Sequence, residues 1–123
     1  MTIARRLGRT ALLFSMVGAV PSLALAHAQL RQAEPPVGGT VSGSPSEIRL
    51  HFSEGVEPSF SGISLSAEGG GSIPTGSPAL GQDASTLVTK VGRALAPGDY
   101  RVEWHAVSVD THKTQGSFTF TVR

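Results

Sequence analysis

The strongest constraint on the fold of this chain is an alternation of apolar and polar residues with a period of two. In the segment 47–52 the apolar residues Ile48, Leu50 and Phe52 alternate with polar ones. Side chains point alternately to the two faces of a β-strand, so this pattern predicts strands with one buried face. The other segments that we predict to be strands are 28–33, 63–65, 86–91, 100–106 and 117–122. No segment shows the stripe of an amphipathic helix.

Glycine and proline separate the predicted strands. Six or seven short strands with such turns indicate an all-β fold, a small antiparallel β-sandwich. Pro97-Gly98 is typical of a type II turn, since glycine accepts a positive φ angle there. Tyr100, which follows this turn, is either the tyrosine corner of an immunoglobulin-like fold or an ordinary half-buried tyrosine. The Gly-, Ser- and Pro-rich segment 67–83 is predicted to be a mobile surface loop.

Residues 1–26 have the features of a secretory signal peptide, and residues 27–123 are expected to form one mature domain. The leader has a basic start, a short apolar stretch and the small residues of Ala24-Leu25-Ala26 as a cleavage site. The apolar stretch is too short for a bilayer, which requires about 20 residues. An uncleaved anchor or a buried N-terminal helix is the less favoured alternative, and either general or twin-arginine export fits the leader.

Cleavage after Ala26 changes the composition of the chain. Three of the ten Lys and Arg residues leave, so seven remain against nine acidic residues, a net charge of −2. Binding to nucleic acid, or insertion into a membrane after cleavage, is therefore not expected. Both methionines, Met1 and Met16, also leave, and the chain has no cysteine. Disulfides, thiolate metal centres and a cysteine nucleophile are thereby excluded from the mature domain.

Two segments carry metal-ligand chemistry. As the first residue after cleavage, His27 would offer both its α-amine and its imidazole Nδ1. Asp110 and His112 have the spacing that places two side chains on one side of an extended segment. Taken alone, His27 could be a coincidence of cleavage, and Asp110 and His112 could be solvated loop residues. Together they form a set of three nitrogens and one oxygen, which favours Cu(II), although Zn²⁺ also uses such residues.

In addition to these residues, several short motifs follow one another in an order and spacing that resemble the CopC family of periplasmic copper-resistance proteins. The likeness spans nearly all of the predicted mature chain. The matching segments are the Ala26/His27 junction, Glu34-Pro35-Pro36-Val37-Gly38, Leu50-His51-Phe52-Ser53-Glu54, Pro97-Gly98-Asp99-Tyr100-Arg101-Val102-Glu103-Trp104, Val107-Ser108-Val109-Asp110-Thr111-His112 and Gly116-Ser117-Phe118-Thr119-Phe120-Thr121-Val122.

This resemblance implies an immunoglobulin-like, Greek-key β-sandwich or barrel that binds one Cu(II) per mature chain. The copper would sit in a histidine brace, with the amine and imidazole of His27, the imidazole of His112 and the carboxylate of Asp110 as ligands. Glu54 matches a family glutamate near the copper. It would hydrogen-bond the terminal amine rather than bind the metal, unless it is simply a surface glutamate.

The sequence departs from some family members in one respect. They carry a methionine-rich loop that binds Cu(I), whereas the comparable segment 65–80 contains no methionine. We therefore expect a single Cu(II) site and no Cu(I) site. His51 and His105 lie on polar faces of their predicted strands, so we expect both to be hydrogen-bonding or surface residues rather than copper ligands.

These features predict a monomeric periplasmic protein that carries or sequesters copper in copper homeostasis and resistance. The resemblance implies an inner-membrane copper transport protein as a partner. Phosphate-binding loops, nucleophile elbows and His-Glu-x-x-His motifs are missing from the sequence, so no enzyme is expected. The alternatives are a histidine-brace copper monooxygenase and a metal-free immunoglobulin-like interaction module.

Overall fold

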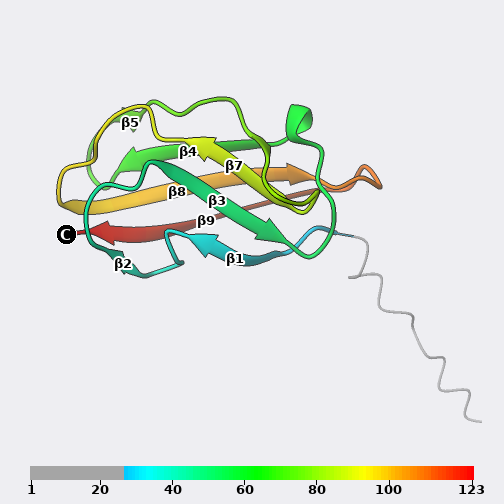
Figure 1. Cartoon of the computed structure of the whole chain (residues 1–123), viewed down its shortest axis with the longest axis horizontal. Helices are drawn as coiled ribbons and strands as arrows, with labels where there is room; N and C mark the ends of the chain where they lie inside the picture. Colours follow the sequence, from blue (N-terminus) through cyan, green and yellow to red (C-terminus); the bar gives the residue numbers. More distant parts are fainter. Residues whose placement is uncertain (1–26) are drawn as a thin grey trace, which may run out of the picture.

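The computed structural model describes residues 27–123, which form a sandwich of two β-sheets (Figure 1). The predicted signal peptide, 1–26, lies outside the described residues. The four-stranded sheet has the order β1-β3-β7-β6, and the five-stranded sheet has the order β2-β9-β8-β4-β5. The strands are β1 Leu30–Glu34, β2 Thr40–Val41, β3 Glu47–Phe52, β4 Gly62–Ala67, β5 Ser72–Ile73, β6 Ala79–Leu80, β7 Thr86–Lys90, β8 Gly98–Val107 and β9 Lys113–Val122, and a short 3-10 helix, η2, spans Pro58–Phe60.

The period-two alternation predicts the buried faces correctly. In β3, Ile48 and Leu50 are completely buried and Phe52 is nearly so, while the intervening residues are partly exposed. Val102 and Phe120 occupy the same inner positions in the five-stranded sheet and are also buried. All strand pairs within the described residues are antiparallel except the two-residue pairing of β2 with β9. The predicted all-β sandwich is therefore confirmed.

The turn before β8 contains the hydrogen bond of a tyrosine corner. The Tyr100 hydroxyl donates to the carbonyl oxygen of Ala96 at 2.6 Å, and the ring stacks on Phe120 with centroids 5.7 Å apart. Gly98 has a φ of +153° and begins β8 opposite Val122, whereas the glycine of a type II turn has a φ of about +80°, so this turn differs from the predicted type II geometry. The open choice for Tyr100 is thus decided by its hydroxyl, which ties the start of β8 to the preceding turn.

The prediction that the segment 67–83 is only a surface loop is wrong. It contains β5, which pairs with β4, and β6, which pairs with β7. Ile73 in β5 is only 4% exposed and belongs to the core. Two-residue strands are too short to produce a recognisable alternation, so glycine and proline dominate the sequence pattern here.

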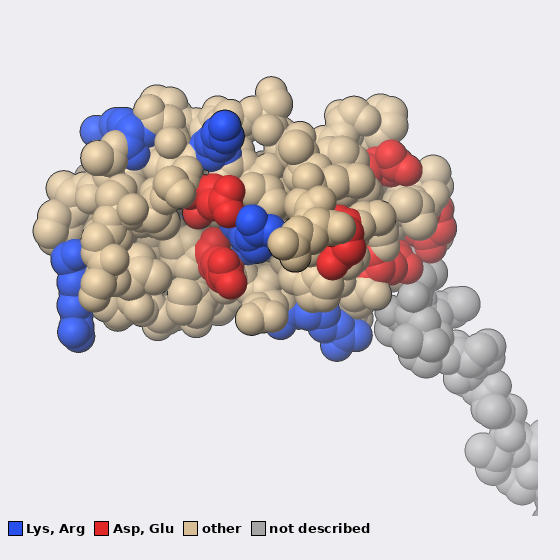
Figure 2. Space-filling view, viewed as in Figure 1, with Lys and Arg blue, Asp and Glu red and all other residues tan. Residues whose placement is uncertain are grey.

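One end of the sandwich brings together four segments that are distant in the sequence. They are the chain leading into β1 and the β3–β4, β6–β7 and β8–β9 connections. Figure 1 shows the chain leading into β1 and the β8–β9 connection at the same end. These connections carry Glu54, Glu57, Asp83 and Asp110, and Figure 2 shows acidic side chains gathered at this end. Such a charge distribution favours the approach of cations. Residues 27–123 contain no helix that is long and apolar enough to cross a membrane.

Candidate metal centre

His27 lies just before β1, in a segment that is anchored on both sides. Ala28 is completely buried, and its carbonyl oxygen accepts a hydrogen bond from the Thr114 hydroxyl of β9 at 2.8 Å. The Gln29 N–H donates to the Ser53 hydroxyl, and the Ser53 N–H donates to the Gln29 carbonyl oxygen, both at 2.8 Å. The backbone next to His27 is therefore fixed between β9 and the end of β3.

The β8–β9 connection, residues 108–112, is a tight turn organised by Ser108. This residue is completely buried, and its N–H donates to the carbonyl oxygen of His112 at 2.9 Å. Thr111 has a φ of +70°, which a residue with a side chain rarely adopts, and its N–H donates to the Ser108 carbonyl oxygen at 2.8 Å. The turn holds Asp110 and His112 beside each other.

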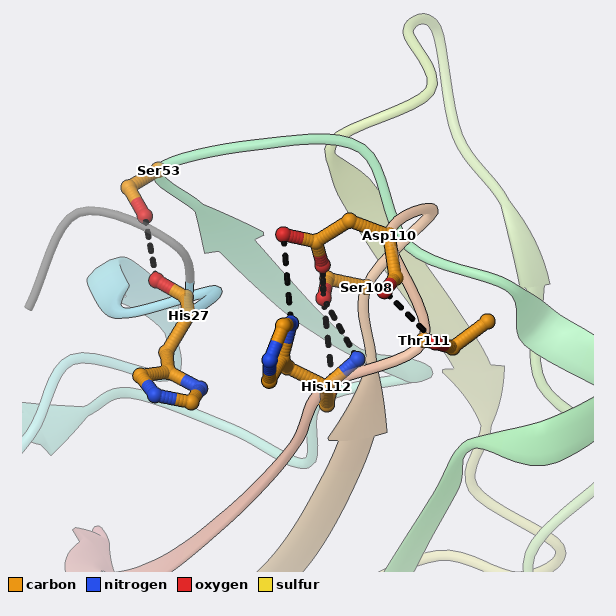
Figure 3. Close-up of polar contacts among 6 residues, drawn as sticks. All are labelled: His27, Ser53, Ser108, Asp110, Thr111 and His112. Carbon is orange, nitrogen blue, oxygen red and sulfur yellow. Dashed lines mark hydrogen bonds and ion pairs between the residues drawn. The ribbon is translucent and has the colours of Figure 1, made fainter. Parts of the chain in front are cut away.

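The structure brings His27, His112 and Asp110 together, as the sequence predicts (Figure 3). The imidazole rings of His27 and His112 meet edge to face, with centroids 4.7 Å apart and an interplanar angle of 88°. Nδ1 of His112 lies 3.3 Å from Oδ2 of Asp110. Nδ1 of His27 is buried and has no hydrogen-bond partner among the described residues. Such buried polar atoms are uncommon, and a bound ligand or ion is one explanation for them.

The Asp110 carboxylate is held in its ionised form mainly by Ser108, which the sequence alone does not identify as a site residue. The Ser108 hydroxyl donates a hydrogen bond to Oδ1 of Asp110 and holds the pKa of Asp110 below its ordinary value of 3.8. The His112 imidazole lowers this pKa further. A polar residue that continues the buried face at the end of β8 is the sequence signal that could have identified Ser108.

Replacing Ser108 with alanine is expected to raise the pKa of Asp110 in the metal-free protein, because the carboxylate loses its main hydrogen-bond donor. With the lowered pKa, Asp110 contributes stability above pH 3.8 that is lost as the pH falls through its folded-state value. The variant should lack part of this contribution. Carboxyl ¹³C chemical shifts followed through an acid titration would measure the change.

The matched control for this prediction is Ser85→Ala. Ser85 donates to Asp83 rather than to Asp110, and its side-chain hydrogen bond is the main cause of a lowered pKa at Asp83. This control should raise the pKa of Asp83 and leave that of Asp110 unchanged. An unchanged Asp110 pKa in Ser108→Ala would contradict the role assigned to Ser108.

In the sequence, Glu54 lies between His27 and the turn that carries Asp110 and His112. Its neighbour Ser53 pairs with Gln29, and on its other side the carbonyl oxygen of Gly55 accepts a hydrogen bond from the Val109 N–H at 3.0 Å. Oε1 of Glu54 is buried without a hydrogen-bond partner among the described residues. Like Nδ1 of His27, this atom is therefore available to a group other than those that the described residues supply.

The other two histidines lie away from this centre. Nδ1 of His51 is 3.0 Å from the Thr86 hydroxyl of β7, as expected for a hydrogen-bonding residue. The His105 ring lies over Gly62 of β4, where a Cβ atom would collide with it. Within residues 27–123, no three His, Asp or Glu side chains form a group that is arranged to hold a metal ion by themselves. The contacts that do form are the pairs His27–His112 and His112–Asp110.

Comparison with known proteins relates nearly all of the described domain to one family. Residues 30–123 match the model of the CopC domain. The chain is 43% identical over 100 residues to protein YobA of Escherichia coli (strain K12), covering 80% of each chain. It is 36% identical over 124 residues to copper resistance protein C of Escherichia coli, covering 95% of this chain and 98% of the relative.

A solved structure shows the same architecture. PcoC, described as a methionine-rich copper resistance protein from Escherichia coli, superposes with a TM-score of 0.72 at 35% sequence identity. The match covers 80% of this chain and all of the PcoC chain.

Proposed function

Since this chain belongs to the CopC family, we propose that it is a periplasmic copper-binding protein that holds one Cu(II) at the end of the sandwich where His27 meets His112. The observation that carries the proposal is the buried Nδ1 of His27, which has no hydrogen-bond partner among the described residues and belongs to a ring in contact with His112. A buried polar atom without a partner is costly, and a metal ion would remove that cost.

The proposed ligands are the α-amine and Nδ1 of His27, the imidazole of His112 and the carboxylate of Asp110. The amine exists only after cleavage before His27, which explains why side chains alone do not form a complete group. An amine has a reference pKa of about 7.7–8.0, so a metal can displace its proton near neutral pH. The resulting set of nitrogen and oxygen donors suits the tetragonal geometry of Cu(II).

Glu54 and Ser108 would assist the proposed ligands by hydrogen bonds and would not bind the metal themselves. Ser108 keeps Asp110 ionised and therefore ready to bind a cation. The buried Oε1 of Glu54 is an acceptor without a partner among residues 27–123, and the terminal amine of a processed chain would be a suitable donor to it. Hydrogen bonds of this kind orient metal ligands and raise metal affinity.

The absence of sulfur from residues 27–123 supports the proposed oxidation state. The relative PcoC is described as methionine-rich, whereas residues 27–123 of this chain contain neither methionine nor cysteine. Cu(I) prefers thioether and thiolate ligands, so the chain offers no soft site for it. We therefore propose that the protein carries or sequesters Cu(II) as a monomer, and that an inner-membrane copper transport protein exchanges copper with it.

Titration of Cu(II) into protein exported by bacteria that express the full chain should give one high-affinity binding event per molecule. The His27→Ala and His112→Ala variants should lose this event, whereas His105→Ala, a matched control on strand β8, should retain it. At a free copper concentration of 100 times the dissociation constant, binding should stabilise the fold by about 2.7 kcal/mol. Isothermal titration and thermal unfolding would measure these effects.

The same samples separate the proposal from its alternatives. Electron paramagnetic resonance should show a tetragonal cupric signal with nitrogen couplings that His105→Ala leaves unchanged. Complete binding in His27→Ala, or no thermal shift with copper, would reject the proposed site. Sustained oxygen consumption with a reductant and a defined substrate would instead identify an enzyme.

A further inference from the structure

We propose that the outer face of the four-stranded sheet contains a second, weaker site for a divalent transition metal, with Nε2 of His51 and Oδ2 of Asp83 as its two protein ligands. The proposal does not depend on the copper site at His27. It rests on a hydrogen-bond chain through β3, β7 and the β6–β7 connection, and on a cavity of about 170 Å³ that His51 and Asp83 both line.

The hydrogen-bond chain determines which nitrogen of His51 carries the proton. The Thr86 hydroxyl has one proton, and it donates that proton to Oδ1 of Asp83 at 2.9 Å. The same hydroxyl oxygen lies 3.0 Å from Nδ1 of His51, so it must accept a hydrogen bond from an Nδ1–H group. A neutral imidazole has only one N–H, and Nε2 therefore keeps its lone pair for a ligand.

Metal-binding histidines in proteins have a similar arrangement, usually without an intervening hydroxyl group. Their second ring nitrogen usually donates to a carboxylate, a carbonyl or water, which fixes the tautomer and makes the ligand nitrogen more basic. Here the Thr86 hydroxyl connects the His51 ring to the Asp83 carboxylate. His51 is thus oriented by its own sheet: its direct partner on β7 is Thr86.

Asp83 supplies the second ligand because its two oxygens have different surroundings. Oδ1 accepts hydrogen bonds from the Ser85 N–H at 3.0 Å, the Ser85 hydroxyl at 2.8 Å and the Thr86 hydroxyl at 2.9 Å. These bonds, the side-chain bond from Ser85 most of all, hold the pKa of Asp83 below its ordinary value of 3.8. The carboxylate is therefore ionised at neutral pH, and Oδ2 accepts none of these three bonds.

The charge around the cavity favours a cation. Two carboxylates, Glu34 and Asp83, line it together with one guanidinium, that of Arg49. The Arg49 charge is partly offset by Glu47, whose Oε1 lies 2.7 Å from Nη2 of Arg49. With two protein ligands, water would fill the remaining coordination positions of the metal. This agrees with the finding that residues 27–123 contain no group of three His, Asp or Glu side chains that could hold a metal. Imidazole with carboxylate suits Zn²⁺ among other divalent ions.

The test is a titration of the exported protein, labelled with ¹⁵N in its imidazoles, with Zn²⁺ alone. Before zinc is added, at a pH where His51 is neutral, its spectrum should show Nδ1 protonated and Nε2 unprotonated. Zinc should shift the Nε2 resonance of His51 in a saturable way. Thr86→Val, which keeps both ligands but breaks the connection between them, should weaken binding about 10–100-fold. Asp83→Asn should also weaken it, and His105→Ala should not.

Each outcome of this titration bears on the proposal. An Nε2–H tautomer in the metal-free protein, or an Nε2 resonance of His51 that does not move at millimolar Zn²⁺, would overturn it. Equal Zn²⁺ affinity at His51 in the wild type, in Thr86→Val and in Asp83→Asn would also overturn the proposal. The resonances of His27 and His112 report the other site in the same spectra, so failure of either site is recognised independently.

Discussion

Acetylating the α-amine of His27 is expected to lower the Cu(II) affinity of the processed protein more than about a hundredfold, or ~2.7 kcal/mol of binding free energy. An amide nitrogen bearing an acetyl group is a far poorer donor than an amine, so the proposed centre loses one ligand directly. It also loses the chelate ring that the amine forms with Nδ1 of the same residue. The imidazole of His27 would then be an isolated ligand, and its contact with His112 would not compensate.

Competition with a chromophoric chelator would measure this change in affinity. The control is a chain acetylated at Lys90 and Lys113 with a free α-amine, which should bind copper as the unmodified protein does. If the terminally acetylated chain retained the affinity of this control, the amine would not be a ligand. The copper would then have to be bound by side chains alone, which the described residues do not present as a group.

Replacing Phe52 with alanine is expected to lower the free energy of unfolding by roughly 3–5 kcal/mol. Phe52 ends β3 and is only 1% exposed, and its ring meets Trp104 of the opposite sheet edge to face with centroids 5.2 Å apart. The substitution leaves a cavity between the sheets, directly before the Ser53 and Glu54 positions of the candidate centre. Urea unfolding, followed by the fluorescence of the single tryptophan, would measure the loss.

Phe60→Ala is the matched control for this substitution. Phe60 belongs to η2 and is 68% exposed, so the same change of side chain removes almost no buried surface. Its effect should stay within about 0.5 kcal/mol, as for most surface substitutions. Similar losses in the two variants would contradict the assignment of Phe52 to the core between the sheets.

The sequence predicts the long strands well and the short ones poorly. Residues 48–52 and 100–106 alternate over enough positions to identify both the strand and its buried face. The two-residue strands β5 and β6 gave no such signal and were predicted as loop, although Ile73 is part of the core. β5 pairs with β4 and β6 pairs with β7, so both short strands depend on residues elsewhere in the chain. Their own local sequence therefore carries little information about this pairing.

The residues of the candidate metal sites also fall into two groups, those that the sequence identifies and those that it does not. His27, Asp110 and His112 could be selected from the sequence because their donor atoms are chemically suited to a metal and because their segments resemble the CopC family. Ser108 and Thr86 could not be selected in this way. Each acts by a hydrogen bond to a carboxylate whose position depends on a turn or on strand pairing. A serine or threonine in a strand has no feature in the sequence that distinguishes this role.

The amino-acid sequence alone predicts the all-β class, the inner faces of the main strands, the lack of sulfur in residues 27–123 and the residues that we propose as metal donors. These properties depend on residue type and on spacing within one segment. The contact of His27 with His112 is visible only in the folded chain, because it joins residues that are 85 positions apart and depends on the anchoring of Ala28 to Thr114. The same holds for the contact of His51 with Thr86 on a neighbouring strand, from which we infer the tautomer of His51. Long-range hydrogen bonds and packing between sheets exist only once the chain is folded.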